Sequence, residues 1–179
     1  MANVFDVADF FVNITNLSED NPITNLKLNK LLYFAQGVFL ARTGKPLFDD
    51  DFEAWPYGPV VPAIYHKYKV CGRNPISTES QDIDRSIFAE DELETLLDVM
   101  REYGKYTGEY LLNLTHRLGT PWSIAAFGEE KKISLQDMES YFKSHPIARL
   151  KDIVKIPEVD SLPADWYDPD EDSEWEGYL

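Results

Sequence analysis

The chain has little of the chemistry that builds catalytic or metal centres. Its single cysteine, Cys71, excludes an intrachain disulfide, which is typical of a protein in a reducing compartment. His66 and Cys71 are only two candidate ligands, too few for a zinc site. Sequence distance does not exclude His116 or His145 as a base for a Cys71-dependent hydrolase, but a lone cysteine more often has a structural role. We therefore expect no metal, no cofactor and no enzymatic activity.

Basic residues and long apolar runs are also scarce. The chain has 17 Lys and Arg against 32 Asp and Glu, for a formal charge of -15, and no basic stripe is evident. This disfavours direct nucleic-acid binding. The longest apolar-rich stretch, residues 31–41, contains Gln36 and Gly37 and is too short to span a membrane. The first residues have no positive segment followed by an apolar core, so no signal peptide is expected. The sequence favours a soluble cytoplasmic protein without membrane contact.

The 179 residues contain enough apolar side chains, 44%, for one compact core. Apolar residues recur at helical spacing in most of residues 4–142, which predicts a mainly α fold with a small β element, an α+β domain. The strongest helix is predicted between Thr24, a cap residue, and Gly44, a typical terminating glycine. Because it is apolar over most of its circumference, we expect it at the centre. Further starts are predicted at Thr107 and Thr120. The helix after Thr107 is expected to end at Gly119, with Tyr110 and Leu118 on its apolar stripe.

Residues 51–68 combine aromatic side chains with three prolines. Proline fixes φ and removes a backbone donor, so no helix can run through residues 55–61. A short strand is expected just before Pro56, and Pro62 fits the first position of a short helix. Two interpretations remain: the rings cap the core, or they form a binding surface. Exposed aromatics here would leave room for a homodimer.

The last residues have a different composition. Residues 156–179 contain nine of the acidic residues and no Lys or Arg, which leaves 23 acidic against 17 basic residues in the remainder. We therefore predict a helical domain over residues 1–155 and an acidic extension over 156–179. The extension either wraps onto its own domain or becomes ordered on a basic partner. In the second case the expected contact residues are Trp166, Tyr167, Asp170, Glu171, Asp172, Trp175 and Tyr178.

Three segments carry a family resemblance. They are KLNKLLYFA at residues 27–35, GKPLF at 44–48 and EAWPYGPV at 53–60, and TPW at 120–122 also fits. Residues 4–142 thereby resemble the Panacea domain, the SocA-like family of antitoxin and phage-associated proteins. The acidic extension is not part of the shared pattern. We expect the motif residues to have structural roles: Lys27, Leu31, Tyr33, Trp55, Pro56, Tyr57, Gly58 and Pro59.

The resemblance implies a helical domain without known catalytic activity that neutralises toxins through direct protein contact. The leading hypothesis is therefore an antitoxin whose partner is a co-encoded protein toxin with a basic surface. Two alternatives are a proteolytic adaptor that delivers a toxin to a protease and a phage counter-defence binding protein. Because such proteins bind unrelated toxins, we expect Trp55 and Tyr57 to fix the β element on the central helix, with variable surfaces selecting the partner.

Overall fold

One helix, α2 (Asn25–Thr43), forms the centre of the fold in the computed structural model, which describes residues 1–16, 21–77 and 85–153. The Thr24 hydroxyl accepts a hydrogen bond from the Lys27 N–H and begins the helix. Gly44, at φ 70°, donates to the Leu40 carbonyl and ends it. Residues on every side of α2 are buried, so the helix is a core element rather than an amphipathic surface helix.

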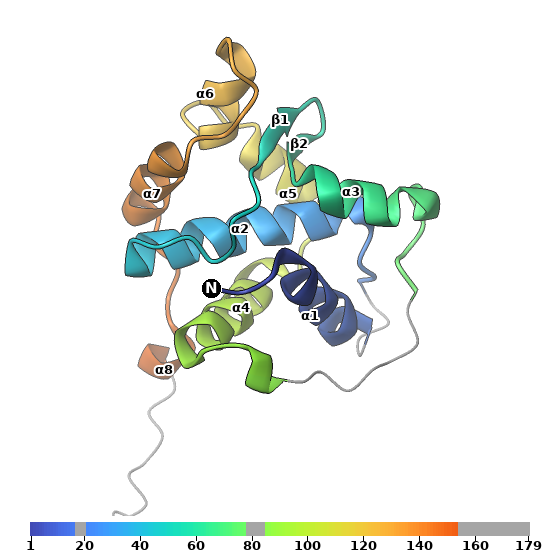
Figure 1. Cartoon of the computed structure of the whole chain (residues 1–179), viewed down its shortest axis with the longest axis vertical. Coiled ribbons are helices and arrows are strands. Elements are labelled where there is room, and N and C mark those ends of the chain that lie inside the picture. The colour runs from blue at the N-terminus through green and yellow to red at the C-terminus, as the bar shows by residue number, and fades with distance from the viewer. Residues whose placement is uncertain (17–20, 78–84, 154–179) are drawn as a thin grey trace, which may run out of the picture. The chain divides into compact units, whose positions relative to one another are not determined.

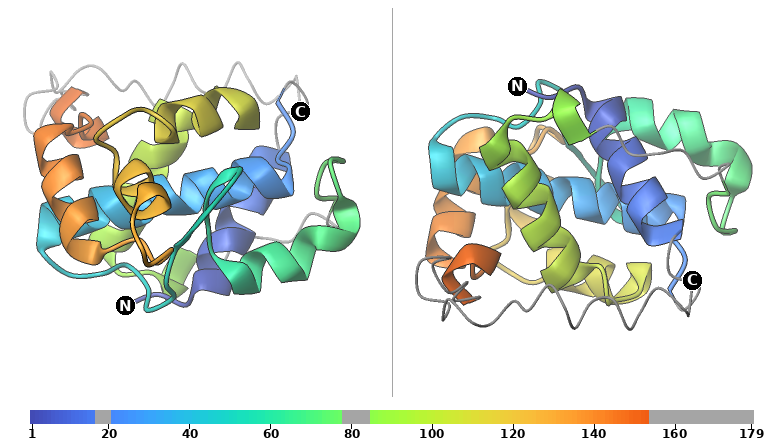
Figure 2. Two further views of the ribbon diagram at one scale, coloured as in Figure 1. Left: turned by 90° about the horizontal axis from the view of Figure 1, so that it is seen from above. Right: turned by 90° about the horizontal axis from the view of Figure 1, so that it is seen from below.

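Shorter helices surround α2, as Figures 1 and 2 show. They are α1 (Val4–Asn16), α3 (Pro62–Tyr68), α4 (Glu90–Tyr103), α5 (Gly108–Thr115), α6 (Pro121–Phe127) and α7 (Leu135–Ser144), with 3-10 turns η1 (Lys69–Cys71) and η2 (Arg85–Ile87). All of them except α6 and the two 3-10 turns have extensive contacts with α2. Seen from below, α1 and α4 lie across α2 on one side (Figure 2).

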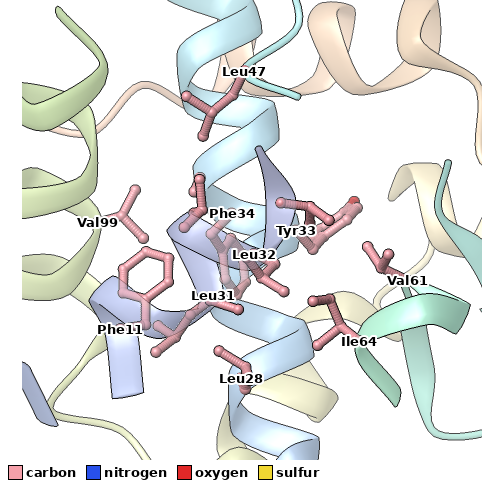
Figure 3. Packing of buried hydrophobic residues seen from close by; sticks show 14 of the residues in the cluster. Phe11, Leu28, Leu31, Leu32, Tyr33, Phe34, Leu47, Val61, Ile64 and Val99 are labelled. Atoms are coloured by element: carbon pink, nitrogen blue, oxygen red, sulfur yellow. The ribbon is translucent and has the colours of Figure 1, made fainter. Parts of the chain in front are cut away.

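The core consists of side chains that these helices direct at α2 (Figure 3). Phe11 of α1 and Val99 of α4 meet the leucines of α2 on one side, and Ile64 of α3 meets them on another. The α7 helix packs close because Gly37 has no side chain. A Cβ there would lie 2.1 Å from the Phe142 ring.

A hairpin of two short strands covers part of α2. Strand β1 (Glu53–Trp55) pairs antiparallel with β2 (Gly58–Val60), and Glu53 lies opposite Val60. Gly58 adopts φ 91°, a conformation that side chains with a Cβ rarely adopt. The other edge of β1 is also paired, because the Ala54 N–H donates to the Lys131 carbonyl at 2.6 Å. The hairpin therefore has no free edge at β1.

The predicted fold class, mainly α with a small β element, is confirmed. The helices begin at the expected caps Thr24, Thr107 and Thr120. The predicted extent of α5 is wrong: the helix ends at Thr115, whose carbonyl accepts a hydrogen bond from the Thr120 hydroxyl at 2.6 Å. Leu118, expected on its apolar stripe, is consequently 89% exposed.

The chain divides into two compact units, residues 1–149 and 150–179. Of the second unit only the short helix α8 (Leu150–Ile153) is described. The predicted contact residues of the extension, Trp166 to Tyr178, lie outside the described residues. Within the described ranges no helix is both long and apolar enough to cross a membrane.

Candidate functional site

Several polar side chains of α2 are buried and bind backbone groups outside the helix. The Lys27 ammonium donates to the Gly104 carbonyl at 2.7 Å, and this carbonyl lies at the negative end of α4. The Gln36 amide donates to the Phe48 carbonyl and accepts from the Leu47 N–H. These bonds offset the cost of burying polar groups and fix the loops on α2.

Lys30 is the most unusual of these residues, because its ammonium is fully buried. It donates to the Pro59 carbonyl at 3.0 Å, and in the described part of the chain it forms no ion pair. Burial lowers the pKa of Lys30 from 10.5 to about 7. Gly58 admits the lysine: a Cβ there would lie 2.5 Å from Lys30 Cε and 3.0 Å from Thr115 Oγ1.

The surroundings of Lys30 bring the sequence motifs together. The His116 ring stacks on Trp122 with 3.7 Å between centroids, and the Trp122 indole donates to the Trp55 carbonyl at 2.9 Å. Burial and the nearby Lys30 ammonium lower the pKa of His116. The segments 27–35, 53–60 and 120–122 therefore meet in one cluster whose contacts stabilise the fold.

Within the segment EAWPYGPV at residues 53–60, which we call the β motif, Trp55 and Tyr57 have different environments. Trp55 is half-buried, packs edge-on against Tyr65 at 4.9 Å and donates from its indole to the Glu53 carboxylate at 2.7 Å. Tyr57 lies in the turn between the strands and is 67% exposed, so the expectation that it packs the β element onto α2 is wrong.

The remaining motif residues are placed as follows. Lys27, Leu31 and Tyr33 are buried on α2, Gly58 and Pro59 are buried in β2, and Pro56 is exposed beside Tyr57. The interpretation of the stretch as a core cap thus fits its two strands, whereas the turn stays available for contact.

A groove that the sequence did not predict lies between α4, α5 and α7. We call it the tyrosine groove, because its walls include Tyr103, Tyr106, Tyr110 and Tyr141. These side chains line a cavity of about 270 Å³. Tyr106 stacks on Tyr110 with 4.3 Å between ring centroids. Buried rings from α2 and α7, among them Phe34 and Phe142, form its floor. The sequence signal was three tyrosines within residues 103–110, of which helical periodicity places only Tyr110 on an apolar stripe.

Opposite charges lie at the two sides of the groove. Burial raises the pKa of Tyr103, and the Glu102 carboxylate raises it further. Burial also raises the pKa of Tyr141, but the Arg117 guanidinium opposes this shift. Glu102 and Arg117 both line the cavity. The groove is therefore apolar at its floor, with an acid by one wall and a base by the other.

The hollow surface continues past Tyr141. A second, more open cavity of about 490 Å³ shares Arg117, Tyr141 and His145 with the tyrosine groove. Leu118 and Ile124 also line it, and they are 89% and 51% exposed. A third cavity of about 490 Å³ lies beside Trp55 and Trp122, between β1 and α6.

The cysteine and histidines considered for catalysis pack against the core or against aromatic rings. Cys71 is half-buried against the core in η1. Each histidine packs against an aromatic ring: His66 on Tyr65, His116 on Trp122 and His145 on Tyr141. Among the described residues no group of three or more His, Cys, Asp and Glu could bind a metal ion.

The comparison with known families identifies the domain. A model of the family described as "Antitoxin SocA-like, Panacea domain" matches residues 28–123, from the start of α2 into α6. The chain belongs to this family. The match contains the Lys30 cluster and the α4 and α5 walls of the tyrosine groove, whereas Tyr141 and His145 lie beyond it.

One curated relative resembles the chain closely. The protein named Antitoxin SocA from Caulobacter vibrioides (strain NA1000 / CB15N) is 34% identical over 125 residues. The aligned stretch covers 65% of this chain and 66% of the relative, slightly less than two thirds of its length. No solved structure matches the chain.

Proposed function

We propose that this protein is an antitoxin that neutralises a co-encoded protein toxin by binding it directly. The observation that carries this proposal is the 34% identity, over 125 residues, to a protein named Antitoxin SocA. In this function the chain acts by contact, without catalysis or a cofactor. The buried polar contacts of α2 keep the scaffold rigid, and surfaces outside that core select the toxin.

We further propose that the acidic extension contributes to toxin binding. Residues 156–179 contain nine acidic residues and no basic ones, so they would attract a toxin with a basic surface. Aromatic side chains such as Trp166, Tyr167, Trp175 and Tyr178 would then anchor the contact, since tryptophan and tyrosine are enriched among residues that dominate binding energy. Asp170, Glu171 and Asp172 would supply negative charge between Tyr167 and Trp175.

The main test is co-expression with the toxin encoded beside the chain. We expect the toxin alone to stop growth and the full chain to restore it. A full-length chain with Trp166 and Trp175 changed to Ser keeps its charge and should rescue less well, as should deletion of residues 156–179. Full rescue by both variants would remove the extension from the proposal. Failure of the full chain to rescue, or to bind the toxin, would overturn the antitoxin function.

Toxin turnover distinguishes sequestration from proteolytic delivery. Direct neutralisation predicts an unchanged toxin half-life after synthesis is stopped, because the toxin persists in an inactive complex. A shorter half-life that depends on a cellular protease would instead identify the chain as an adaptor.

A further inference from the structure

Several large apolar side chains at the tyrosine groove and beside it are exposed to solvent. Tyr110 is 44% exposed at its edge, and the adjoining cavity adds Leu118, at 89% exposure, and Ile124, at 51%. Contiguous apolar surface with a polar rim is typical of a protein-binding site. Tyrosine suits such a site because it offers a rigid, amphipathic contact area at low conformational cost.

The shape of the surface favours a segment of a protein over a small molecule. The two cavities, of about 270 and 490 Å³, have Arg117, Tyr141 and His145 in common as lining residues, and the second is open to solvent. A small ligand would need an enclosed pocket that covers most of its surface. An elongated and partly open groove instead fits a helix or extended segment that inserts one apolar side chain at a time.

The floor of the groove indicates which side chain enters it. Phe34 and Phe142 are buried there, and Phe34 stacks on Tyr103 with 4.0 Å between ring centroids. The Tyr33 hydroxyl also reaches the floor, where it faces the Trp122 backbone N–H without completing a hydrogen bond of normal geometry. An aromatic or aliphatic side chain would pack on these rings, whereas a charged one would lose its hydration there.

The charges at the groove indicate what flanks that side chain. Glu102 lies near the Tyr103 hydroxyl on one wall, and Arg117 lies near the Tyr141 hydroxyl on the other. A partner is therefore complementary when a basic residue beside its apolar anchor faces Glu102. The surplus of acidic residues in the chain, 32 against 17 basic ones, favours the same kind of partner.

We propose that the tyrosine groove is the docking site for an apolar anchor side chain of the toxin, flanked by a basic residue that pairs with Glu102. This inference rests on the proposed antitoxin function and adds a contact surface on the folded domain. Toxin binding then uses α4, α5 and α7 in addition to the acidic extension.

A matched pair of substitutions tests the proposal in the full chain. Leu118→Asp places a charge beside the groove, and Val70→Asp places one on η1, which lines neither cavity; both parent residues are 89% exposed. The probe is a catalytically inactive form of the co-encoded toxin, titrated against each variant. We expect Leu118→Asp and Tyr110→Arg to raise the Kd at least tenfold and Val70→Asp to leave it unchanged. Glu102→Lys should raise the Kd and reduce the association rate.

The outcomes separate this inference from the proposed function. If the wild-type chain binds the toxin and all four variants bind equally well, the groove is not the docking site and the antitoxin function stands. If Val70→Asp weakens binding as much as Leu118→Asp, the effect is not local and the inference is wrong. If the wild-type chain binds no toxin, both proposals fall. Equal melting temperatures for the variants and the wild type verify that each substitution acts on binding and not on folding.

Discussion

Helix α2 and the surface formed by α5, α6 and α7 reverse the usual placement of polar and apolar residues. Four polar side chains of α2 are buried, and each is bonded to backbone outside the helix: Lys27, Asn29, Lys30 and Gln36. By contrast, apolar side chains between α5 and α7 face solvent, among them Leu118 and Phe127. Buried polar groups are tolerated because they have partners within the fold, whereas exposed apolar groups are typical of surfaces that bind another protein. The first region specifies the structure and the second is available for recognition.

The largest expected difference in the free energy of unfolding is between substitutions of one leucine from each region. Leu31→Ala should lower the free energy of unfolding by about 2–5 kcal/mol, because Leu31 is completely buried and its loss leaves a cavity. Leu118→Ala should change the same quantity by less than about 0.5 kcal/mol, because Leu118 is 89% exposed. Urea denaturation of both variants measures this. Similar losses would contradict the division between core and recognition surface.

The next effect concerns the contact between α2 and α7. Gly37→Ala should destabilise the protein by about 1–3 kcal/mol, since the new methyl group would overlap the Phe142 ring. In a Phe142→Leu background the additional cost of Gly37→Ala should be smaller, because the ring is absent. A double-mutant cycle in urea measures this coupling, and additive costs would show that the ring is not the cause.

Lys30 makes stability depend on pH. Its pKa is lowered to about 7 in the folded protein, so the unfolded chain binds the proton more tightly and the free energy of unfolding rises as the pH rises above 7. From pH 7 to pH 9 the gain should be about 2 kcal/mol, and Lys30→Met should lack it.

The groups around Lys30 add little to the pH-dependent difference in stability between the wild type and Lys30→Met. The Pro59 carbonyl does not titrate, and His116, whose pKa is lowered, is mostly neutral across this range. Lys27, with a pKa near 8, is common to both proteins and cancels in their difference. Denaturation at pH 7, 8 and 9 measures that difference, and parallel pH profiles would rule out a buried, depressed lysine.

The smallest effect lies within the β motif. Tyr57→Ala should change the free energy of unfolding by less than about 0.5 kcal/mol, because the side chain is 67% exposed. Trp55→Ala should cost more, since it removes the contact with Tyr65 and the bond to Glu53. Thermal melts of the two variants compare them. A larger loss for Tyr57→Ala would restore its expected role as a packing residue.

Local chemistry made much of the fold predictable. Thr24, Thr107, Thr120 and Ser134 begin helices through hydrogen bonds to the N–H groups of the following turn, and these signals lie within a few residues of sequence. The position of α2 at the centre also followed from its apolar circumference. Strand β2 was not predicted, because Pro59 reads as a strand breaker unless the pairing partner is known.

The candidate site was less predictable, because it depends on partners distant in sequence. Nothing near Lys30 in the sequence indicates that its ammonium binds the Pro59 carbonyl. The tyrosine groove likewise joins Tyr103 and Tyr141, which belong to separate helices. Periodicity identifies which face of a helix is apolar, but not whether a neighbouring helix covers it. The end of α5 was missed for a different reason: it is marked by a local bond from the Thr120 hydroxyl to the Thr115 carbonyl, which hydrophobic periodicity does not reveal.

The close fit of Phe142 against Gly37 also constrains how the chain folds during synthesis. Helix α2 leaves the ribosome early, whereas α7, which covers Gly37, is among the last described elements to be made. Until α7 arrives, the part of α2 around Gly37 lacks its cover. Domains generally complete their folding as units, so the nascent chain stays accessible to chaperones and proteases until α7 has emerged. We therefore expect a chain that stops before α7 not to complete this core.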